Sequence, residues 1–441
     1  MAQTGKMAQG IELPRHNGDA QSRKGHPLNR RMRILFVSTG LPIPANNGFA
    51  IRSLSIVKAL ASSGHELSFV SFAQRTRPES LDPLPRYCDE IDLVEQEIVS
   101  VSQGASYLRR ATCLFGLKSY SIERFSSAEM RDRIASHLKA RKFDIILCDS
   151  LYALVNIPQT DTPIVLNCHN AEHLIFKRYT QVEKNFFKKC YASVEARLIR
   201  NAERLGCQRA AMAMVCSNVD EGTLRHLHSN LPIHVIPNAV DTDSYHSNET
   251  RSSQDTLLFQ GGMDWYPNRD AVEFFVRSIL PKVRAECPGV RFTVAGRNPP
   301  AQFAAEIGSE RGVEFTGTVP DMRPYLSAAT VVVVPLRFGS GTRIKILEAC
   351  AAGVPVVSTA VGAEGLDLKP GKDIVLADDP TEFAQAVITL LRDRPRRDSI
   401  ARQARTVIVD RYSQPILKRS LDNLLFDLEG IKKDAGSVSQ A

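Results

Sequence analysis

Short, continuously apolar segments alternate with helical patterns along most of the chain. The first of them, residues 33–38, is typical of a strand buried in a parallel sheet. A loop rich in turn formers follows, and apolar residues then recur at helical spacing until Gly64 ends the helix. The chain resumes as a strand at residues 66–72. This order predicts a right-handed crossover between parallel strands, and therefore an α/β fold.

The alternation continues through two successive series. In the first, strands are expected at residues 144–148, 163–167, 213–216 and 234–236, with one long helix over about 171–206. In the second, strands are expected at residues 256–259, 291–295, 313–315, 331–334 and 355–358. Two series of this kind predict two doubly wound, Rossmann-like domains that face a cleft.

The length of 441 residues also favours two domains, because it exceeds what a single core usually supports. A polar stretch at residues 247–254 is the expected linker between them. The predicted division, in chain order, is a disordered basic tail at 1–31, an N-terminal domain at 32–240, a C-terminal domain at 241–412, a helix at 413–432 that packs back on the N-terminal domain, and a disordered tail at 433–441.

The composition indicates a cytoplasmic protein. No apolar run approaches the roughly 20 residues that a membrane-spanning helix needs, and the polar start of the chain lacks the apolar segment of a signal peptide. The nine cysteines never form a C-x-x-C pair. We therefore expect free thiols in a reducing compartment rather than disulfides or a structural zinc site.

The net charge of +8 is unevenly distributed. Residues 1–31 contribute +4, while residues 107–142 and residues 177–209 contribute +6 each, so the remainder carries −8. An excess confined to two segments of the N-terminal half suits peripheral contact with an anionic membrane surface or a phosphate-bearing acceptor. A solvated helix face explains the same charges equally well. Nucleic acid is a poor fit, because basic and aromatic residues do not interleave as they do in known binding modules.

Residues 169–173 read HNAEH and match the H-x-x-E-H pattern of one class of zinc peptidases. That pattern requires both histidines on one helical turn. Here a predicted strand ends just before His169, and helical character begins only near Ala171. The two histidines would then lie on a loop and on a helix, so a zinc site is not expected.

The exit of a parallel strand is nevertheless where open α/β sheets bind their ligands. His169, Asn170 and Glu172 are therefore candidate site residues for a different chemistry. For Asn170, a simple role as the cap of the following helix explains the sequence equally well.

The segment at residues 331–359 is the most informative one, because it reads as a buried strand, a glycine-rich loop, a helix and another buried strand. Gly339 and Gly341 allow the backbone to approach a ligand, with amide groups free at the start of the helix. That terminus favours a phosphate, and Arg343 and Lys345 add positive charge beside it. Glu348 follows within the helix, where its carboxylate can accept hydrogen bonds from a ribose diol. The alternative is a surface helix with paired charges.

With these motifs, the chain resembles the retaining, nucleotide-sugar-dependent glycosyltransferases of family 4, often called group 1 glycosyl transferases, which have the two-domain GT-B fold. The resemblance covers residues 32–430. The segments that carry it are Leu41-Pro42 with Gly48 and Arg52, Gly64-His65-Glu66, His169-Asn170 with Glu172, residues 236–241 and residues 339–355. Residues 259–268, 339–343 and 362–366 are similar to the branch found in exopolysaccharide biosynthesis clusters.

The resemblance implies that a sugar is transferred from a nucleotide diphosphate sugar to an acceptor hydroxyl, without a metal or cofactor. Its implied catalytic residues are His169, Glu172, Arg343 and Lys345. Its implied donor-binding residues are Gly262, Arg269, Gly339, Ser340, Gly341, Thr342 and Glu348. Gly48, Arg52 and Asn170 would form a loop for the acceptor or a phosphate. The expected acceptor is a glycan, or a polyprenyl-linked glycan at the inner face of the cytoplasmic membrane.

Three positions depart from the family pattern. Ser340 stands where the first of two glutamates is usual, and Met263 where an arginine commonly follows the glycine after the first strand of the C-terminal domain. Asn47 stands where a glycine is common. Arg343, Lys345 or Arg269 would then supply the phosphate contact of the missing arginine.

Three other functions remain as alternatives at this point. A sugar-nucleotide 2-epimerase has the same fold, and incubation with candidate donors in the absence of an acceptor would distinguish it, because an epimerase isomerises the sugar unaided. A zinc metallopeptidase would rest on the match at residues 169–173. A non-catalytic nucleotide-sugar-binding subunit would rest on Ser340.

Overall fold

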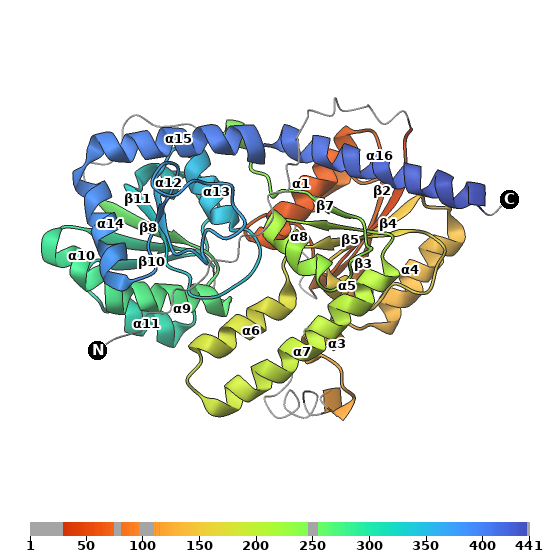
Figure 1. Ribbon diagram of the computed structural model, residues 1–441, viewed down its shortest axis with the longest axis horizontal. Helices are drawn as coiled ribbons and strands as arrows, with labels where there is room; N and C mark the ends of the chain where they lie inside the picture. Colours follow the sequence, from red (N-terminus) through yellow and green to blue (C-terminus); the bar gives the residue numbers. More distant parts are fainter. Residues whose placement is uncertain are drawn as a thin grey trace, which may run out of the picture.

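The computed structural model describes residues 30–74, 81–96, 110, 112–113, 115–245, 255–297 and 299–438. Within these residues two α/β domains lie side by side, and helices α15 (Arg394–Tyr412) and α16 (Gln414–Val438) run along the same side of both (Figure 1). None of the helices in the described ranges is long and apolar enough to cross a membrane. The predicted linker at residues 247–254 and nearly all of the predicted N-terminal tail lie outside the described residues.

The N-terminal domain is built on a parallel sheet of seven strands in the order β3-β2-β1-β4-β5-β6-β7. Its strands are β1 (Arg33–Ser38), β2 (Glu66–Gln74), β3 (Glu90–Gln96), β4 (Ile145–Asp149), β5 (Ile164–Cys168), β6 (Met212–Val215) and β7 (Ile233–Val235). Its helices include α1 (Gly48–Ser62), α3 (Tyr120–Glu123), α4 (Ala128–Ala140), α5 (Leu151–Leu154), α6 (Glu172–Val182), α7 (Phe186–Arg209) and α8 (Asn218–Arg225). The strand order reverses between β1 and β4, so their carboxyl ends open a crevice.

The C-terminal domain repeats this plan with six strands in the order β10-β9-β8-β11-β12-β13. They are β8 (Thr256–Gln260), β9 (Arg291–Ala295), β10 (Val313–Gly317), β11 (Val331–Val334), β12 (Val356–Ser358) and β13 (Val375–Leu376). Its helices include α9 (Tyr266–Phe274), α10 (Leu280–Glu286), α11 (Ala301–Gly308), α12 (Arg323–Ala328), α13 (Ile344–Ala351) and α14 (Pro380–Arg392), with a π-helical turn at Phe275–Ile279. The prediction of two doubly wound domains is confirmed.

All eleven predicted strands are present, but the structure adds two more. β3 alternates acidic and apolar residues and lies at the edge of its sheet, so it lacks the apolar run of a central strand. β13 has only two residues. The single helix predicted over residues 171–206 is wrong, because the chain breaks between α6 and α7. Asn185 caps α7 there by accepting a hydrogen bond from the amide of Lys188 at 3.1 Å.

The two chain segments that join the domains meet at one point. Val240 donates its amide to the carbonyl of Tyr412 at 2.9 Å and forms a β-bridge with Ser413. Beyond this point α16 returns to the N-terminal domain and lies beside α1 (Figure 1). It buries five leucines in that domain's core: Leu417, Leu421, Leu424, Leu425 and Leu428. The helix runs to Val438, whereas the sequence predicted an end at residue 432 and a tail over 433–441.

All nine cysteines lie within the described residues, and none of them is paired in a disulfide there. Five of them are buried, and Cys190 is exposed at the start of α7.

Candidate active site

The loops that follow the strands of the two domains meet across the crevice. His169 and Asn170 follow β5, and residues 339–342 follow β11. The amide of Ala171 donates to Oγ of Ser340 at 3.1 Å. A Cβ atom built on Gly341 would lie only 2.3 Å from Oδ1 of Asn170. The structure therefore brings the predicted donor loop directly against the predicted histidine loop.

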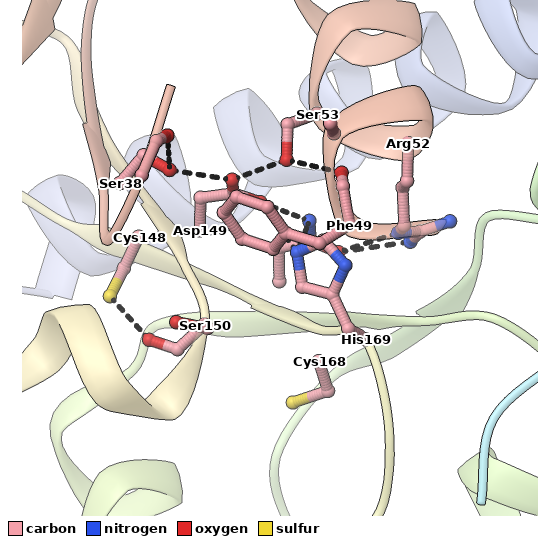
Figure 2. Close-up of polar contacts among 12 residues, drawn as sticks. Ser38, Phe49, Arg52, Ser53, Cys148, Asp149, Ser150, Cys168 and His169 are labelled. Atoms are coloured by element: carbon pink, nitrogen blue, oxygen red, sulfur yellow. Dashed lines mark hydrogen bonds and ion pairs between the residues drawn. The ribbon is translucent and has the colours of Figure 1, made fainter. Parts of the chain in front are cut away.

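Asp149, at the end of β4, organises the side chains on the N-terminal wall of this site (Figure 2). Its carboxylate is fully buried. Serine hydroxyls from β1 and α1 donate to Oδ2, that of Ser38 at 3.0 Å and that of Ser53 at 2.6 Å. Oδ1 accepts from Nδ2 of Asn167 at 2.7 Å and from Nε2 of His169 at 2.8 Å. Since a carboxylate only accepts hydrogen bonds, Nε2 of His169 carries a proton and donates it to Oδ1.

Asp149 was not among the predicted site residues. The sequence does contain a signal for it, because an acid directly follows the apolar run at residues 144–148. The argument that selected His169, its position at a strand exit, applies equally to Asp149. What the sequence lacks is the sheet order, which places β4 beside β5 and the two side chains within contact.

Arg52 supports loops and does not line the predicted phosphate loop. Arg52 is 2% exposed. Nε and Nη2 donate to Oδ1 of Asn167, while Nη1 donates to the carbonyl of Ile236 and to Oδ1 of Asn238. Asn238 in turn donates to Oγ1 of Thr342 at 2.5 Å. Arg52 thus fixes the loop after β7 that holds the donor loop across the crevice.

Gly48 opens α1 and faces the other domain, since an added Cβ would lie 3.8 Å from Cδ1 of Ile344. Asn47, which stands where the family commonly has a glycine, caps α1 by accepting from the amide of Ala50 at 3.1 Å. Asparagine at this position therefore stabilises the N-terminus of α1.

The donor loop presents unpartnered hydrogen-bond donors. Gly339 and Gly341 have positive φ angles of 143° and 74°, which glycine adopts readily. Within the described part of the chain, the amides of Gly341 and Thr342 donate to no acceptor. Arg343 folds back so that Nη1 donates to the carbonyls of Ser340 and Gly341, but its buried Nη2 has no partner. Burial lowers the pKa of this guanidinium to about 10.

Lys345 is a second cation without an ion pair in the described residues. Its ammonium donates to Oδ1 of Asn268 at 2.9 Å and lies 4.2 Å from the centroid of the Phe259 ring. Burial, reinforced by the neighbouring charge of Arg343, lowers the pKa of Lys345 to about 7.

Glu348 lies deeper on α13, and both of its oxygens are engaged. Oε1 accepts from the hydroxyl of Tyr245 at 3.0 Å, and Oε2 accepts from Nε2 of Gln260 at 2.6 Å. Burial raises the pKa of this carboxyl. Each oxygen retains a second lone pair, so the carboxylate can still accept from a diol.

Glu172 faces the protein interior from the first turn of α6. Tyr152 donates to Oε2 at 2.8 Å, and Asn170 donates to Oε1 at 3.0 Å. Burial raises the pKa of the carboxyl to about 7. Glu172 therefore does not face the crevice directly; it contacts the side-chain amide of Asn170, which does.

The two histidines of the peptidase pattern form hydrogen bonds with different carboxylates. His169 bonds Asp149 from the loop, whereas Nδ1 of His173 bonds Oε2 of Glu203 on α7. No group of three potential metal ligands occurs among the residues that the structure describes. The metallopeptidase alternative is not favoured.

Gly262 and Arg269 flank the loop after β8. Nη1 of Arg269 donates to the carbonyl of Met263 at 2.6 Å, which turns it toward its own loop. The cation beside Gly262 is instead Arg297, which was not predicted: its Nε would lie 3.3 Å from a Cβ on that glycine. Arg297 follows β9, pairs with Asp264 at 3.1 Å and donates to Oδ1 of Asn46 in the other domain at 2.9 Å.

Solved structures share this arrangement of two domains. Sucrose-phosphate synthase from Thermosynechococcus elongatus superposes with a TM-score of 0.70 at 17% identity, over 91% of this chain and 100% of that one. HepE from Anabaena, solved in complex with UDP-glucose, gives a TM-score of 0.63 at 14% identity, over 90% of this chain and 100% of that one. The molecule therefore has the GT-B fold of two Rossmann-like domains.

Sequence comparisons define the family. Residues 46–244 match the model described as Glycosyltransferase Family 4, and residues 254–393 match the model described as Glycosyl transferases group 1. The chain belongs to the group 1 glycosyltransferases. It is 24% identical over 396 residues to an uncharacterized 44.6 kDa protein in the cps region of Klebsiella pneumoniae, covering 86% of this chain and 96% of that protein. The lipopolysaccharide core biosynthesis glycosyltransferase LpsE of Rhizobium meliloti is 28% identical over 147 residues, 32% of this chain and 43% of LpsE.

Proposed function

We propose that the protein transfers a sugar from a nucleotide diphosphate sugar to an acceptor hydroxyl with retention of the anomeric configuration. The observation that carries this proposal is the pair of cations at the start of α13. Arg343 has a buried nitrogen without a partner, and Lys345 lies partly buried without a carboxylate. Because desolvated cations without a counter-ion are unfavourable, they favour binding of an anion. A diphosphate would accept from both of them.

The same donors would stabilise the leaving group. As the bond to the sugar breaks, negative charge grows on the terminal phosphate. Nη2 of Arg343 and the amides of Gly341 and Thr342 are in place before the reaction, so they need no rearrangement to meet it. Hydrogen bonds to charged groups contribute about 1.5–3 kcal/mol each. In this proposal Arg297, beside Gly262, supplies the cation that the family usually places after that glycine.

Glu348 would bind the ribose hydroxyls of the donor, and His169 would accept a hydrogen bond from a sugar hydroxyl through Nδ1. Ser340, in place of the usual glutamate, holds the two domains together through the amide of Ala171. The donor loop and Asn170 are already in contact, so a diphosphate can enter only when the domains separate. Reclosure would then exclude water from the site.

For the acceptor we propose a lipid-linked glycan used in the synthesis of a surface polysaccharide, at the inner face of the cytoplasmic membrane. Two relatives support this choice: the Klebsiella protein in the cps region and LpsE in lipopolysaccharide core biosynthesis. The concentration of positive charge in residues 107–142 and 177–209, both in the N-terminal domain, supports an anionic surface as the acceptor's location.

The test is release of nucleoside diphosphate from a panel of sugar nucleotides, with UDP-glucose first, in the presence and absence of a bacterial lipid extract. We expect release that requires the extract and is lowered at least about tenfold by Arg343→Ala. Lys369→Ala, an exposed lysine of the same domain, is the matched control. Isomerised donor in the absence of extract would instead favour the epimerase. No release with any donor would refute the proposal.

A further inference from the structure

The four most exposed large apolar side chains among the described residues lie in two segments of the N-terminal domain. Phe186 and Phe187, 70% and 80% exposed, are the first two residues of α7. Phe115 and Leu117 are 92% and 78% exposed. Together these four side chains are called here the apolar tip. Figure 1 shows both segments at the end of the domain that is remote from α16.

Contacts of α7 hold the two segments together. The guanidinium of Arg110 lies over the rings of Tyr120 and Tyr191, with centroid distances of 5.3 and 5.7 Å. Ser119 donates its hydroxyl to Oε1 of Glu195 at 2.6 Å, and that oxygen also accepts from the amide of Ser121. The residues on either side of Phe115 and Leu117 therefore contact the second and third turns of the helix that Phe186 and Phe187 begin.

The charge around the apolar tip is positive. Lys184, Lys188 and Lys189 are exposed beside the two phenylalanines, and none of them forms an ion pair within the described residues. The nearest acid along the chain, Glu183, is occupied by the Tyr179 hydroxyl and the amide of Asn185. Exposed aromatic side chains next to exposed lysines are suited to an anionic bilayer, because the aromatic rings can enter the boundary between headgroups and acyl chains while the lysines contact the headgroups.

We propose that the apolar tip inserts into an anionic lipid bilayer and holds the active site at a fixed height above it. This inference rests on the proposed lipid-linked acceptor. Helix α6 connects the two places, because it begins beside His169 and ends at Val182, next to the tip. Its 11 residues span roughly 16 Å. A sugar carried on a lipid diphosphate, standing just above the headgroups, would meet the crevice at that height.

The same helix is fixed to the donor side of the crevice. Arg178, on α6, donates to the carbonyl of Gly339 at 2.6 Å and forms a two-pronged ion pair with Glu364. The membrane-bound tip and the donor loop are therefore joined by one rigid element. A second copy of the chain is a poor occupant of the tip, because its own unpaired lysines would face these lysines.

The test is sedimentation of the full chain with vesicles of phosphatidylcholine, with and without phosphatidylglycerol. We expect binding only to the anionic vesicles, weakened by salt. Phe186→Ser with Phe187→Ser should lower the binding constant at least about tenfold, and Lys188→Gln with Lys189→Gln should remove the preference for anionic lipid. Lys369→Gln with Lys372→Gln, exposed in the C-terminal domain, is the control pair and should bind as the wild type does.

Three outcomes overturn the inference: binding indifferent to phosphatidylglycerol, equal binding by the phenylalanine variant, or a dimer in solution that this variant abolishes. Release of nucleoside diphosphate with a detergent-solubilised acceptor is measured in parallel, and the phenylalanine variant should retain it. If the protein releases nucleoside diphosphate but does not bind vesicles, this inference alone is refuted. Vesicle binding by a protein that releases no nucleotide with any donor refutes the proposed function alone.

Discussion

The carboxylate of Asp149 is fully buried and accepts four hydrogen bonds from described residues, of which His169 is the one that follows β5 into the crevice. Asp149→Asn keeps the shape and lets the serine hydroxyls accept from the new amide. We therefore expect a melting temperature close to the wild-type value. Turnover should still fall at least about tenfold, because the imidazole loses the charge that fixes its proton and its orientation.

A double-mutant cycle separates this role from a merely structural one. His169→Ala should lower turnover by about a hundredfold. If Asp149 acts through His169, then Asp149→Asn should add nothing further in the His169→Ala background. Multiplied losses in the double variant would show that Asp149 acts on the reaction by another route.

Lys345 predicts a pH dependence of donor binding. In the free protein the pKa of Lys345 is about 7, and a diphosphate favours the charged form. Above pH 7 the donor must therefore bind together with a proton, and kcat/KM for the donor should fall roughly tenfold per pH unit. Lys345→Arg, which stays protonated, should keep kcat/KM flat over that range. An identical alkaline limb in the variant would assign the titration to another group.

At the scale of elements, α6 carries a buried acid whose ionisation opposes folding. The pKa of Glu172 is about 7 in the folded protein, against an ordinary value of 4.5. Between these values the folded chain holds a proton that the unfolded chain has lost. The free energy of unfolding therefore decreases as pH rises, by about 1.4 kcal/mol per unit from this group alone.

Glu172→Gln removes that contribution while keeping a partner for Tyr152 and Asn170. The stability of the variant relative to the wild type should therefore increase between pH 5 and pH 8, by an amount on the order of 2 kcal/mol. Chemical denaturation at several pH values measures it. Glu314→Gln, which removes an exposed carboxylate from the other domain, is the matched control. Parallel curves for wild type and Glu172→Gln would contradict the assignment.

The elements show where sequence patterns suffice. Buried parallel strands are continuously apolar, so all eleven that were predicted are found, and the strand exit before His169 follows directly. Asp149 and Arg297 were missed for a different reason. Each meets its partners through a neighbouring strand or the opposite domain, and a linear sequence does not state which strands are neighbours. The break between α6 and α7 was also missed. Asn185 is a residue type that often caps helices, but it lies within a long helical pattern, so the sequence did not distinguish a cap from a helix interior.

At the scale of the whole molecule, the two domains are closed on one another around the crossing at Val240 and Ser413. Across the crevice, Arg178 on the N-terminal domain and Glu364 on the C-terminal domain form two hydrogen bonds of 2.5 and 2.7 Å. The side chains of Arg178 and Glu364 are only 21% and 25% exposed, so solvent screens the pair less than it screens a surface pair. In the proposed function the donor enters only an open crevice, so this ion pair would stabilise the state that follows donor binding.

Glu364→Gln should therefore shift the molecule toward the open state. We expect a larger radius of gyration by X-ray scattering, together with a donor KM raised and a turnover lowered, each by about threefold to tenfold. Asp367→Asn, which breaks an exposed pair with Arg411 within the C-terminal domain, is the matched control. Because that pair does not cross the crevice, its loss should leave scattering and kinetics unchanged. If both variants scatter alike, closure is held by the loop contacts at Ser340 and Thr342 rather than by the ion pair.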